Sequence, residues 1–415
     1  MHGRSLEGKP VDARRLAVRV LSPLVTLLLA GLVLAGCVTA GARNPYTIDE
    51  MTGSAVAGRY DLRYFPGRKP DVIGALGWRE ESALPDLSAE AGGDGRFDML
   101  ALSSGGPDGA YGAGAIKGMV QGGTLPRYEI VTGVSTGALI APFVFTGPGN
   151  EALLEQVYTG TSFDKLLGAP NLFTALGGAS LYPGTRIPEF MKRHVDDALI
   201  ARVAVQHAKG RRLLVATANL DASELVVWDM GRIASLATPR GNELFRSVLR
   251  AAISIPGALP PVEIVSSYGG RQFRELHGDA GVLAYFYGDE TLVPDSWRAE
   301  TGRGKKQKAR NNPRLDVILH NQIEAPPRTV EAKAIKLVGA SASNLTRTSM
   351  RLLLDDTIRR TAAAGVDMRY AYIPRNWRTV SSLEFDAEYM RRTFGLGYRQ
   401  ALEDTFWHSG PRNRQ

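Results

Sequence analysis

The sequence predicts an α/β protein in which a mostly parallel central sheet carries helices on both faces. Three observations favour this class. Short apolar segments that read as strands alternate with longer helical patterns along much of the chain, which is typical of a parallel sheet covered on both sides. In two places a strand passes through a glycine-containing turn directly into a helix. The composition, 44% hydrophobic and 22% charged, fits a globular protein with a substantial core.

The first part of the chain has the features of a secretion signal. Basic residues precede an apolar run over 24–34, which is too short to span a bilayer comfortably and fits the core of a signal peptide. The run leads into Leu34-Ala35-Gly36-Cys37, which resembles the lipobox of bacterial lipoproteins. This resemblance implies removal of residues 1–36 and lipidation of Cys37, the single cysteine of the chain.

Lipidation implies a place in the bacterial cell envelope, because acyl chains hold a protein to a membrane by burying methylene groups at about 0.8 kcal/mol each. Val38 and Thr39 follow the cysteine, and the absence of aspartate there implies the outer membrane, facing the periplasm. The alternative is a plain secretory signal with an unmodified cysteine. No later segment is apolar enough to cross a bilayer, and a single cysteine permits no internal disulfide.

The net charge of +8 lies partly in the signal region, and the basic residues are not interleaved with aromatic ones. Nucleic-acid binding is therefore not predicted. Residues 37–95 are expected to be a tether and lead-in, because they contain many glycines and show no sustained period. For the aromatic residues between Asp49 and Pro70 two alternatives stay open, packing on the core or on a partner.

The core begins with an apolar strand over 97–103. Ser104-Gly105-Gly106-Pro107-Asp108-Gly109 follows and runs into a helix that extends to about Val120. A glycine-rich loop between a strand and a helix presents unobstructed amides to an anion. That anion is either a nucleotide phosphate or the oxyanion of a tetrahedral acyl intermediate. The ending of a Walker motif is missing and Ser104 stands where a dinucleotide motif needs glycine, so the oxyanion is favoured.

A second strand, turn and helix follow in Val131-Thr132-Gly133-Val134-Ser135-Thr136-Gly137-Ala138-Leu139-Ile140. A strand that reverses sharply into a helix holds Ser135 in a strained, exposed position and crowds Gly133 and Gly137. If the two strands are parallel neighbours, both turns lie at the same carboxyl edge of the sheet. Ser135 is therefore the predicted nucleophile for an ester carbonyl.

A serine hydroxyl needs a proton acceptor to become a good nucleophile. The chain order of an ordinary α/β-hydrolase is met by Ser135, Asp279 and His320. The surroundings of Asp279 favour another arrangement, because His277-Gly278-Asp279-Ala280-Gly281 reads as a strand end with small residues. An aspartate placed there can approach another backbone closely.

Taken in order, the loop 104–111, Gly133-Val134-Ser135-Thr136-Gly137, the segment 251–261 and Asp279-Ala280-Gly281 resemble the patatin-like phospholipase family over 97–289. The resemblance implies a Ser–Asp dyad, with Ser135 as nucleophile and Asp279 as general base. It also implies a loop that supplies oxyanion donors, here Gly105, Gly106 and Gly109.

The chain departs from the family pattern at Ser104, Asp108 and Ala280. Asp108 matters most, because it brings a negative charge to a loop that must stabilise an oxyanion, unless its side chain turns away or meets an arginine. A dyad also requires a suitable base. Free aspartate has a pKa near ~3.9, and burial raises it. We therefore expect a largely buried Asp279 within hydrogen-bond reach of Ser135.

Residues 290–415 are expected to be a C-terminal α/β extension of the same domain. The predicted strands lie over 213–218, 225–228, 315–323 and 366–373, and the predicted helices over 242–253, 344–364 and 385–406, with 151–200 mainly helical. The apolar loop 169–183 either lines an acyl pocket or packs in the core. The basic run 302–314 is either a solvated loop or a contact with lipid headgroups.

The function expected from these features is that of a lipid-anchored serine hydrolase, which cleaves esters of phospholipid, lysophospholipid or other acyl compounds through an acyl-enzyme. This chemistry requires no metal and no organic cofactor. Alternatives are an esterase with a Ser–Asp–His triad through His320, and a catalytically silent lipid-binding lipoprotein. Acyl transfer to an acceptor other than water would use the same residues.

Overall fold

The computed structural model describes residues 43–68, 72–77, 85–86, 93–160, 166–171, 178–294, 297, 312–327, 329–381, 383–403 and 405–411. The predicted signal peptide and Cys37 lie outside these residues, as do most of the basic run 302–314 and part of the loop 169–183. Within the described residues, no helix combines the length and the apolar character that a membrane span needs.

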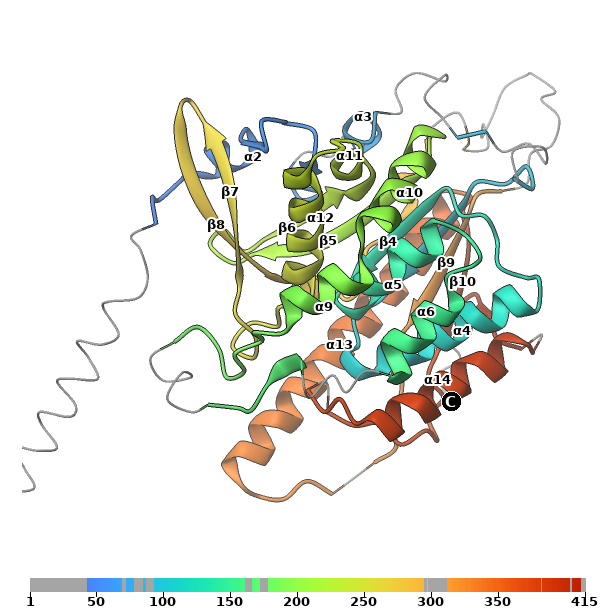
Figure 1. Cartoon of the computed structure of the whole chain (residues 1–415). Coiled ribbons are helices and arrows are strands. Elements are labelled where there is room, and N and C mark those ends of the chain that lie inside the picture. The colour runs from blue at the N-terminus through green and yellow to red at the C-terminus, as the bar shows by residue number, and fades with distance from the viewer. Residues whose placement is uncertain are drawn as a thin grey trace, which may run out of the picture.

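The centre of the sheet is a run of parallel strands in the order β5-β4-β3-β9-β10 (Figure 1). They are β3 (Asp98–Leu102), β4 (Ile130–Val134), β5 (Arg212–Asn219), β9 (Arg314–Leu319) and β10 (Asp367–Tyr372). Every residue of β3, β4 and β5 is buried, which is typical of parallel strands covered on both faces. Because β3 and β4 are parallel neighbours, the turns that follow them meet at one edge.

Antiparallel strands extend this centre, so the sheet of the described residues, with 11 strands, is mixed. They are β1 (Ala55–Val56), β2 (Arg63–Tyr64), β6 (Glu224–Asp229), β7 (Val262–Tyr268), β8 (Arg271–Asp279) and β11 (His408–Ser409). The tight turn between β7 and β8 is made by Gly269 and Gly270, which both have positive φ. The predicted α/β class is confirmed, and its parallel part is the centre of the sheet.

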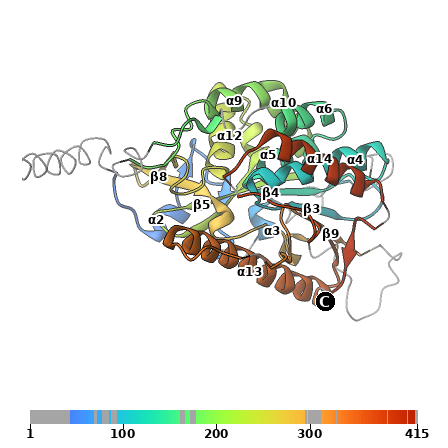
Figure 2. The ribbon, with the colours of Figure 1, turned by 90° about the horizontal axis from the view of Figure 1, so that it is seen from below.

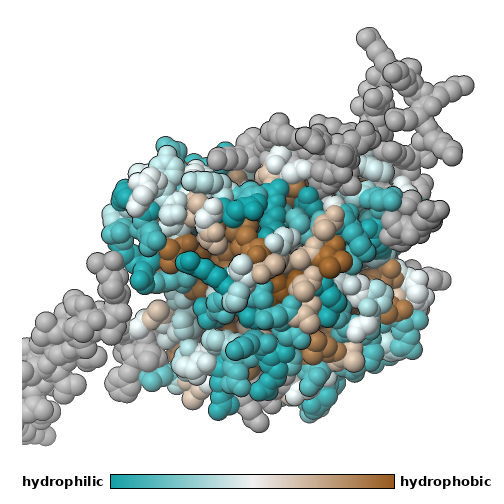
Figure 3. All heavy atoms as spheres, turned by 45° about the horizontal axis from the view of Figure 1, so that its top comes forward, coloured by the Kyte–Doolittle hydropathy of each residue, from teal (hydrophilic) through white to brown (hydrophobic). Residues whose placement is uncertain are grey.

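Helices cover both faces of the sheet (Figure 2). One face carries α4 (Gly109–Gln121), α5 (Thr136–Phe145), α6 (Glu151–Glu155), α9 (Ile187–His194), α10 (Asp197–Ala208), α12 (Pro239–Ala252) and α14 (Ala387–Ala401). The long α13 (Ala334–Ala363) crosses the other face. Hydrophobic clusters lie on each side, and on the face drawn in Figure 3 hydrophilic residues surround recessed hydrophobic ones.

Several predicted boundaries differ from the structure. The strand predicted over 315–323 ends at Leu319, and the helix predicted over 385–406 ends at Ala401. The helix predicted over 344–364 already begins at Ala334. The described residues of 334–349 include no buried side chain. This half of α13 therefore lacks the core-facing apolar periodicity by which a helix is recognised in a sequence.

The described part of the predicted tether belongs to the folded domain. Residues 43–68 contain α2 (Ile48–Thr52), whose start is closed by a capping box between Thr47 and Glu50. In the same segment β1 pairs with β7 and β2 pairs with β6. Met51, Leu62 and Phe65 are buried, whereas Tyr60 is 72% exposed. The alternative in which this segment packs on the core is therefore the one observed.

Candidate active site

Ser135 occupies the single-residue turn between β4 and α5, with φ 54° and ψ −124°. A Cβ atom on Gly133 would lie 2.6 Å from the Cα atom of Ala138, and one on Gly137 would overlap the carbonyl of Leu102. Both neighbours are backbone atoms that cannot move aside. Glycine is therefore required on each side of the serine, as the elbow pattern predicts.

Asp279 lies at the end of β8 and meets Ser135 directly. The Ser135 hydroxyl donates to Oδ2 of Asp279 at 2.5 Å, and each residue is 3% exposed. The other carboxylate oxygen, Oδ1, accepts the amide of Gly281 at 2.7 Å. Pairing of Thr217 in β5 with Asp279 in β8 brings the carboxylate to the same edge as the serine turn.

The burial of Asp279 changes its acidity. Desolvation raises the pKa of Asp279 to about 6, although the Ser135 hydroxyl and the Gly281 amide favour the charged form. The carboxylate is then still mostly ionised at neutral pH, and it is a stronger base than a solvated aspartate. The expectation of a buried aspartate within hydrogen-bond reach of Ser135 matches this geometry.

The glycine-rich loop turns sharply between β3 and α4. Gly106 has a φ of 57°, and a Cβ atom on Gly105 would overlap the backbone of His320. Among the described residues we find no acceptor for the amides of Gly105 and Gly106, so both are free to bind an anion. The amide of Gly109 instead donates to the carbonyls of Gly106 and Pro107. The prediction of Gly109 as an oxyanion donor is therefore not supported.

Gly109 has a different reason to be glycine, because a Cβ atom there would overlap the side chain of Thr136. Thr136 begins α5, so its amide has no partner within the helix. Tyr158 holds this residue by donating to the Thr136 carbonyl at 2.9 Å and by a hydroxyl–hydroxyl contact of 2.8 Å. Sequence reasoning missed Thr136, although its place directly after the serine of the elbow was the available signal.

The structure resolves how the chain accommodates Asp108. Its Oδ1 accepts the hydroxyl of Tyr389, which comes from α14, 281 positions away. Burial raises the pKa of Asp108 to about 7, partly offset by that hydrogen bond. The side chain thus pairs with a tyrosine rather than an arginine, and at neutral pH a large fraction of it is uncharged. No local pattern around Asp108 points to Tyr389.

His320 does not complete a triad. Its ring Nδ1 lies 2.6 Å from the Ser103 carbonyl oxygen, and its Nε2 has no partner among the described residues. Burial lowers the pKa of His320 to about 4. Because the Ser135 hydroxyl contacts Asp279 directly, no imidazole stands between them. The alternative Ser–Asp–His arrangement is contradicted, and His320 instead packs beneath the loop, against Gly105 and Gly112.

The residues after Asp279 bring the third sequence motif into contact with the glycine-rich loop. Ala280 is fully buried in the core. A Cβ atom on Gly281 would lie 2.7 Å from the hydroxyl of Ser104, so the third motif packs against the first. The Ser104 amide donates to the carbonyl of Tyr285 at 2.8 Å. The small residues predicted around Asp279 are thus required by close contact.

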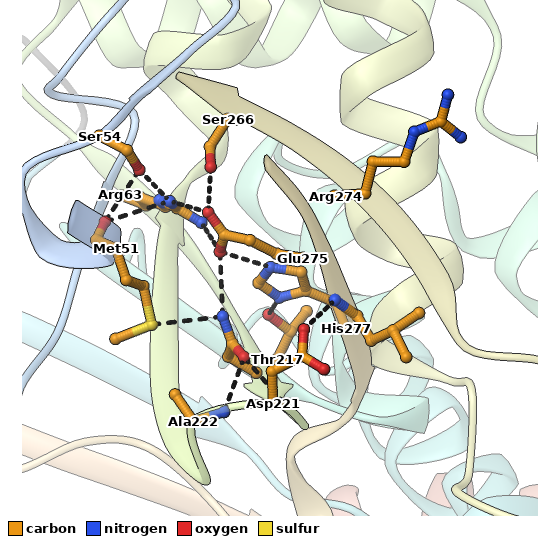
Figure 4. A network of polar contacts seen from close by, with 12 residues as sticks. Met51, Ser54, Arg63, Thr217, Asp221, Ala222, Ser266, Arg274, Glu275 and His277 are labelled. Atoms are coloured by element: carbon orange, nitrogen blue, oxygen red, sulfur yellow. Dashed lines mark hydrogen bonds and ion pairs between the residues drawn. The ribbon is translucent and has the colours of Figure 1, made fainter. Parts of the chain in front are cut away.

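A buried polar network holds β8 in place (Figure 4). Arg63 of β2 makes two hydrogen bonds of 2.7 Å to Glu275 of β8. Glu275 also accepts from Asn219 at 3.0 Å, and it contacts His277 at 3.3 Å. His277 in turn lies 3.0 Å from the hydroxyl of Thr217. Through this network the N-terminal segment fixes the strand that ends in Asp279.

The charges in this network are balanced inside the protein. Burial opposes ionisation of Glu275, but the contacts with His277 and Arg63 hold its pKa below its usual value. Burial lowers the pKa of His277, so the pair Arg63–Glu275 carries the charge. Among the described residues, no group of three or more His, Cys, Asp or Glu side chains is placed to hold a metal ion.

A serine hydroxyl that is hydrogen-bonded to a buried carboxylate, beside loop amides on an α/β sheet, is an arrangement suited to hydrolysis of esters. Residues 100–285 match the family model of patatin-like phospholipases. The chain therefore carries a patatin-like phospholipase domain, as its motifs predict, and this domain is in general terms that of a lipid acyl hydrolase.

Among solved structures, the chain is similar to the crystal structure of VipD from Legionella pneumophila. The TM-score is 0.37 with 13% sequence identity, over 77% of this chain and 68% of that chain. No curated protein matches the chain.

Proposed function

We propose that the protein hydrolyses acyl esters of phospholipids, lysophospholipids or related lipids through an acyl intermediate on Ser135. The observation that carries this proposal is the 2.5 Å hydrogen bond between two buried groups, the Ser135 hydroxyl and the Asp279 carboxylate. The raised pKa of Asp279, about 6, makes the carboxylate a better proton acceptor than it is in water.

In the first half of the reaction Asp279 takes the proton from Ser135 while the serine oxygen attacks the ester carbonyl. The amides of Gly105, Gly106 and Thr136 would stabilise the negative charge that develops on the carbonyl oxygen. The intermediate then expels the alcohol, which receives the proton from Asp279. In the second half a water molecule gives its proton to Asp279 and attacks the acyl-serine. As the fatty acid is released, Asp279 returns that proton to the Ser135 oxygen.

An apolar rim supports a lipid substrate. Val282 and Leu283, which follow the motif of Asp279, are 57% and 45% exposed. Large hydrophobic side chains exposed beside a reactive group favour an acyl chain over a polar substituent.

We also propose that the mature protein is anchored by lipid on Cys37 in the outer membrane, facing the periplasm. Arg43, the first described residue, donates a hydrogen bond to the carboxylate of Asp221 at 2.7 Å. The six peptide steps from Cys37 to Arg43 span at most about 22 Å. The anchor therefore keeps the domain close to a membrane surface, where the substrate would lie.

Labelling with a fluorophosphonate tests the nucleophile, because only an activated serine reacts with it. We expect wild-type protein to be labelled and to hydrolyse lipids from a panel of phospholipids and lysophospholipids. Ser135→Ala should abolish both. Asp279→Asn should lower hydrolysis by roughly 10³-fold or more, because it removes the base.

His320→Ala separates the alternatives, since a triad enzyme would lose activity to the same extent as in Asp279→Asn. Unlabelled wild-type protein would instead support a silent lipid-binding lipoprotein.

A further inference from the structure

The N-terminal half of α13 is a helix without a core to pack on. Over 334–349 no described side chain is buried, whereas Met350 and Leu354 in the second half are fully buried. The free half is built mainly from alanine, glycine, serine, threonine and asparagine around a few apolar residues. Of these, glycine, serine, threonine and asparagine are weak helix formers, and helices of this length are marginal in water when nothing packs against them. A surface that covers this half would stabilise it.

The exposed face of this helix carries a stripe of large apolar side chains. Val338, Leu345 and Leu352 follow one another at intervals of seven residues, which places them on one side of the helix. They are 65%, 70% and 65% exposed. The spacing places them opposite the side that buries Met350 and Leu354. This stripe faces away from the protein body and is therefore open to a partner.

The polar groups of the same half are compatible with a partly dehydrated environment. The hydroxyl of Ser343 donates to the carbonyl of Gly339 at 2.9 Å, and that of Thr346 donates to Ala342 at 3.0 Å. Hydroxyls that bond back to the preceding turn do not need water as a partner.

The charge of this region indicates what kind of surface would cover the helix. Between Ala332 and Leu354 the chain holds basic residues and no acidic one. Where the helix meets the body, a cavity of about 360 Å³ is lined by Arg347, Arg351 and Arg375 together with a single acidic residue, Glu324. The basic residues lie on the side of α13 opposite the stripe, so the helix has one apolar and one basic side. This is the pattern of a helix that lies in an anionic lipid interface, with its apolar side toward the acyl chains and its cations at the level of the phosphates.

This end of α13 is connected to the glycine-rich loop through a short series of contacts. Arg347 lines one cavity with Glu324. Asn321, three positions before Glu324, donates to the Tyr285 hydroxyl at 2.7 Å, and the Tyr285 carbonyl accepts the Ser104 amide at 2.8 Å. From Arg347 the free half extends for about 20 Å, at 1.5 Å per residue. Its end and the start of the described chain lie toward the same side of the molecule (Figures 1 and 2). A membrane that covers the helix would therefore be near both the site and the proposed anchor.

We infer that the N-terminal half of α13 docks on an anionic phospholipid surface and presents the active site to it. The docking itself is independent of the chemistry at Ser135. Only the step from docking to catalysis rests on the proposed function.

Site-specific fluorescence tests the docking in the full chain. In a Cys37→Ser background, Leu345→Cys supplies the single cysteine for an environment-sensitive label, and Val205→Cys, at a position 55% exposed on α10, is the matched control. With phosphatidylglycerol vesicles we expect a blue shift and quenching by lipid-borne quenchers for the label at 345 alone. Phosphatidylcholine vesicles should give a clearly weaker response, and raised salt should weaken the response to phosphatidylglycerol. An unchanged label at 345 would overturn the inference, as would a shift that needs only protein, which would identify a second copy as the occupant.

An activity measurement completes the test. Val338→Ser with Leu345→Ser should lower hydrolysis of phosphatidylglycerol in vesicles by roughly tenfold or more, because each buried side chain contributes about that much to partitioning. Hydrolysis of a soluble short-chain ester should not change, since both side chains are exposed on α13 and neither belongs to the site around Ser135. Arg351→Gln should weaken the preference for anionic vesicles, with Arg359→Gln, 73% exposed at the other end of the helix, as control. A protein inactive on every ester would refute the proposed function, but the fluorescence result would still decide the docking.

Discussion

Ser135 holds a backbone conformation that few residues other than glycine adopt, with φ 54°. The surroundings enforce it, because Gly133 and Gly137 admit backbone atoms where any side chain would collide. The partner of Ser135, Asp279, is buried to the same extent and has a raised pKa. Strain at one residue and desolvation at the other are both destabilising, and such features cluster at functional sites.

The pH dependence of activity should report two carboxyl groups. Activity is expected to rise as Asp279 loses its proton, through a pH of about 6. It should fall again as Asp108, with a pKa of about 7, becomes negatively charged beside the oxyanion loop. Asp108→Asn keeps an acceptor for Tyr389 but cannot ionise. We therefore expect this variant to keep the acidic limb of the kcat/KM profile and to lose the alkaline limb. An alkaline limb that persists unchanged would show that Asp108 has no influence on the oxyanion.

Strand β8 carries Asp279, and its position depends on a buried ion pair. Arg63 and Glu275 have side chains only 3% and 0% exposed, at 2.7 Å. The pair joins β8 to β2, which lies outside the segment that the family model covers. Such a pair contributes little net stability relative to apolar residues, but breaking it leaves an unpaired buried charge.

Arg63→Met should lower the free energy of unfolding by about 3–5 kcal/mol, because Glu275 is then buried without its counter-charge. Arg68→Met is the matched control, since its ion pair with Glu224 lies at the surface and should contribute less than about 1 kcal/mol. Chemical denaturation of both variants measures the difference. Equal losses for the two would contradict the assignment of Arg63–Glu275 as the element that holds β8.

The molecule closes its catalytic sheet with strands from both ends of the chain. β2 covers the outer edge of β6, and β9 pairs with β3, the strand that leads into the glycine-rich loop. The core of the predicted catalytic region 97–289 is thus incomplete without residues that precede and follow it.

A chain cut to residues 97–289 is expected not to fold, because the edges of β3 and β6 would be unpaired and exposed. A chain of residues 43–411 should fold with the same stability as the full chain. Circular dichroism and thermal unfolding distinguish the two. Cooperative unfolding of the 97–289 chain at the same temperature would refute the dependence on the flanking strands.

The local sequence alone was sufficient to predict the features that local steric constraints impose. The elbow around Ser135, the loop at Gly105 and Gly106 and the small residues after Asp279 follow from turns that admit few residue types. Strands β3, β4 and β5 of the parallel centre were predicted for a similar reason, because burial on both faces favours a mainly apolar run.

Contacts between distant segments were decided only by the folded structure. Tyr389 meets Asp108 from 281 positions away, and Arg63 reaches Glu275 across 212 positions. Neither pair leaves a local pattern, because a polar side chain shows no sign in sequence of where its partner lies. The same holds for the packed role of the N-terminal segment and for the free half of α13. Periodicity reports which side of an element is apolar, and the three-dimensional arrangement alone determines what that side meets.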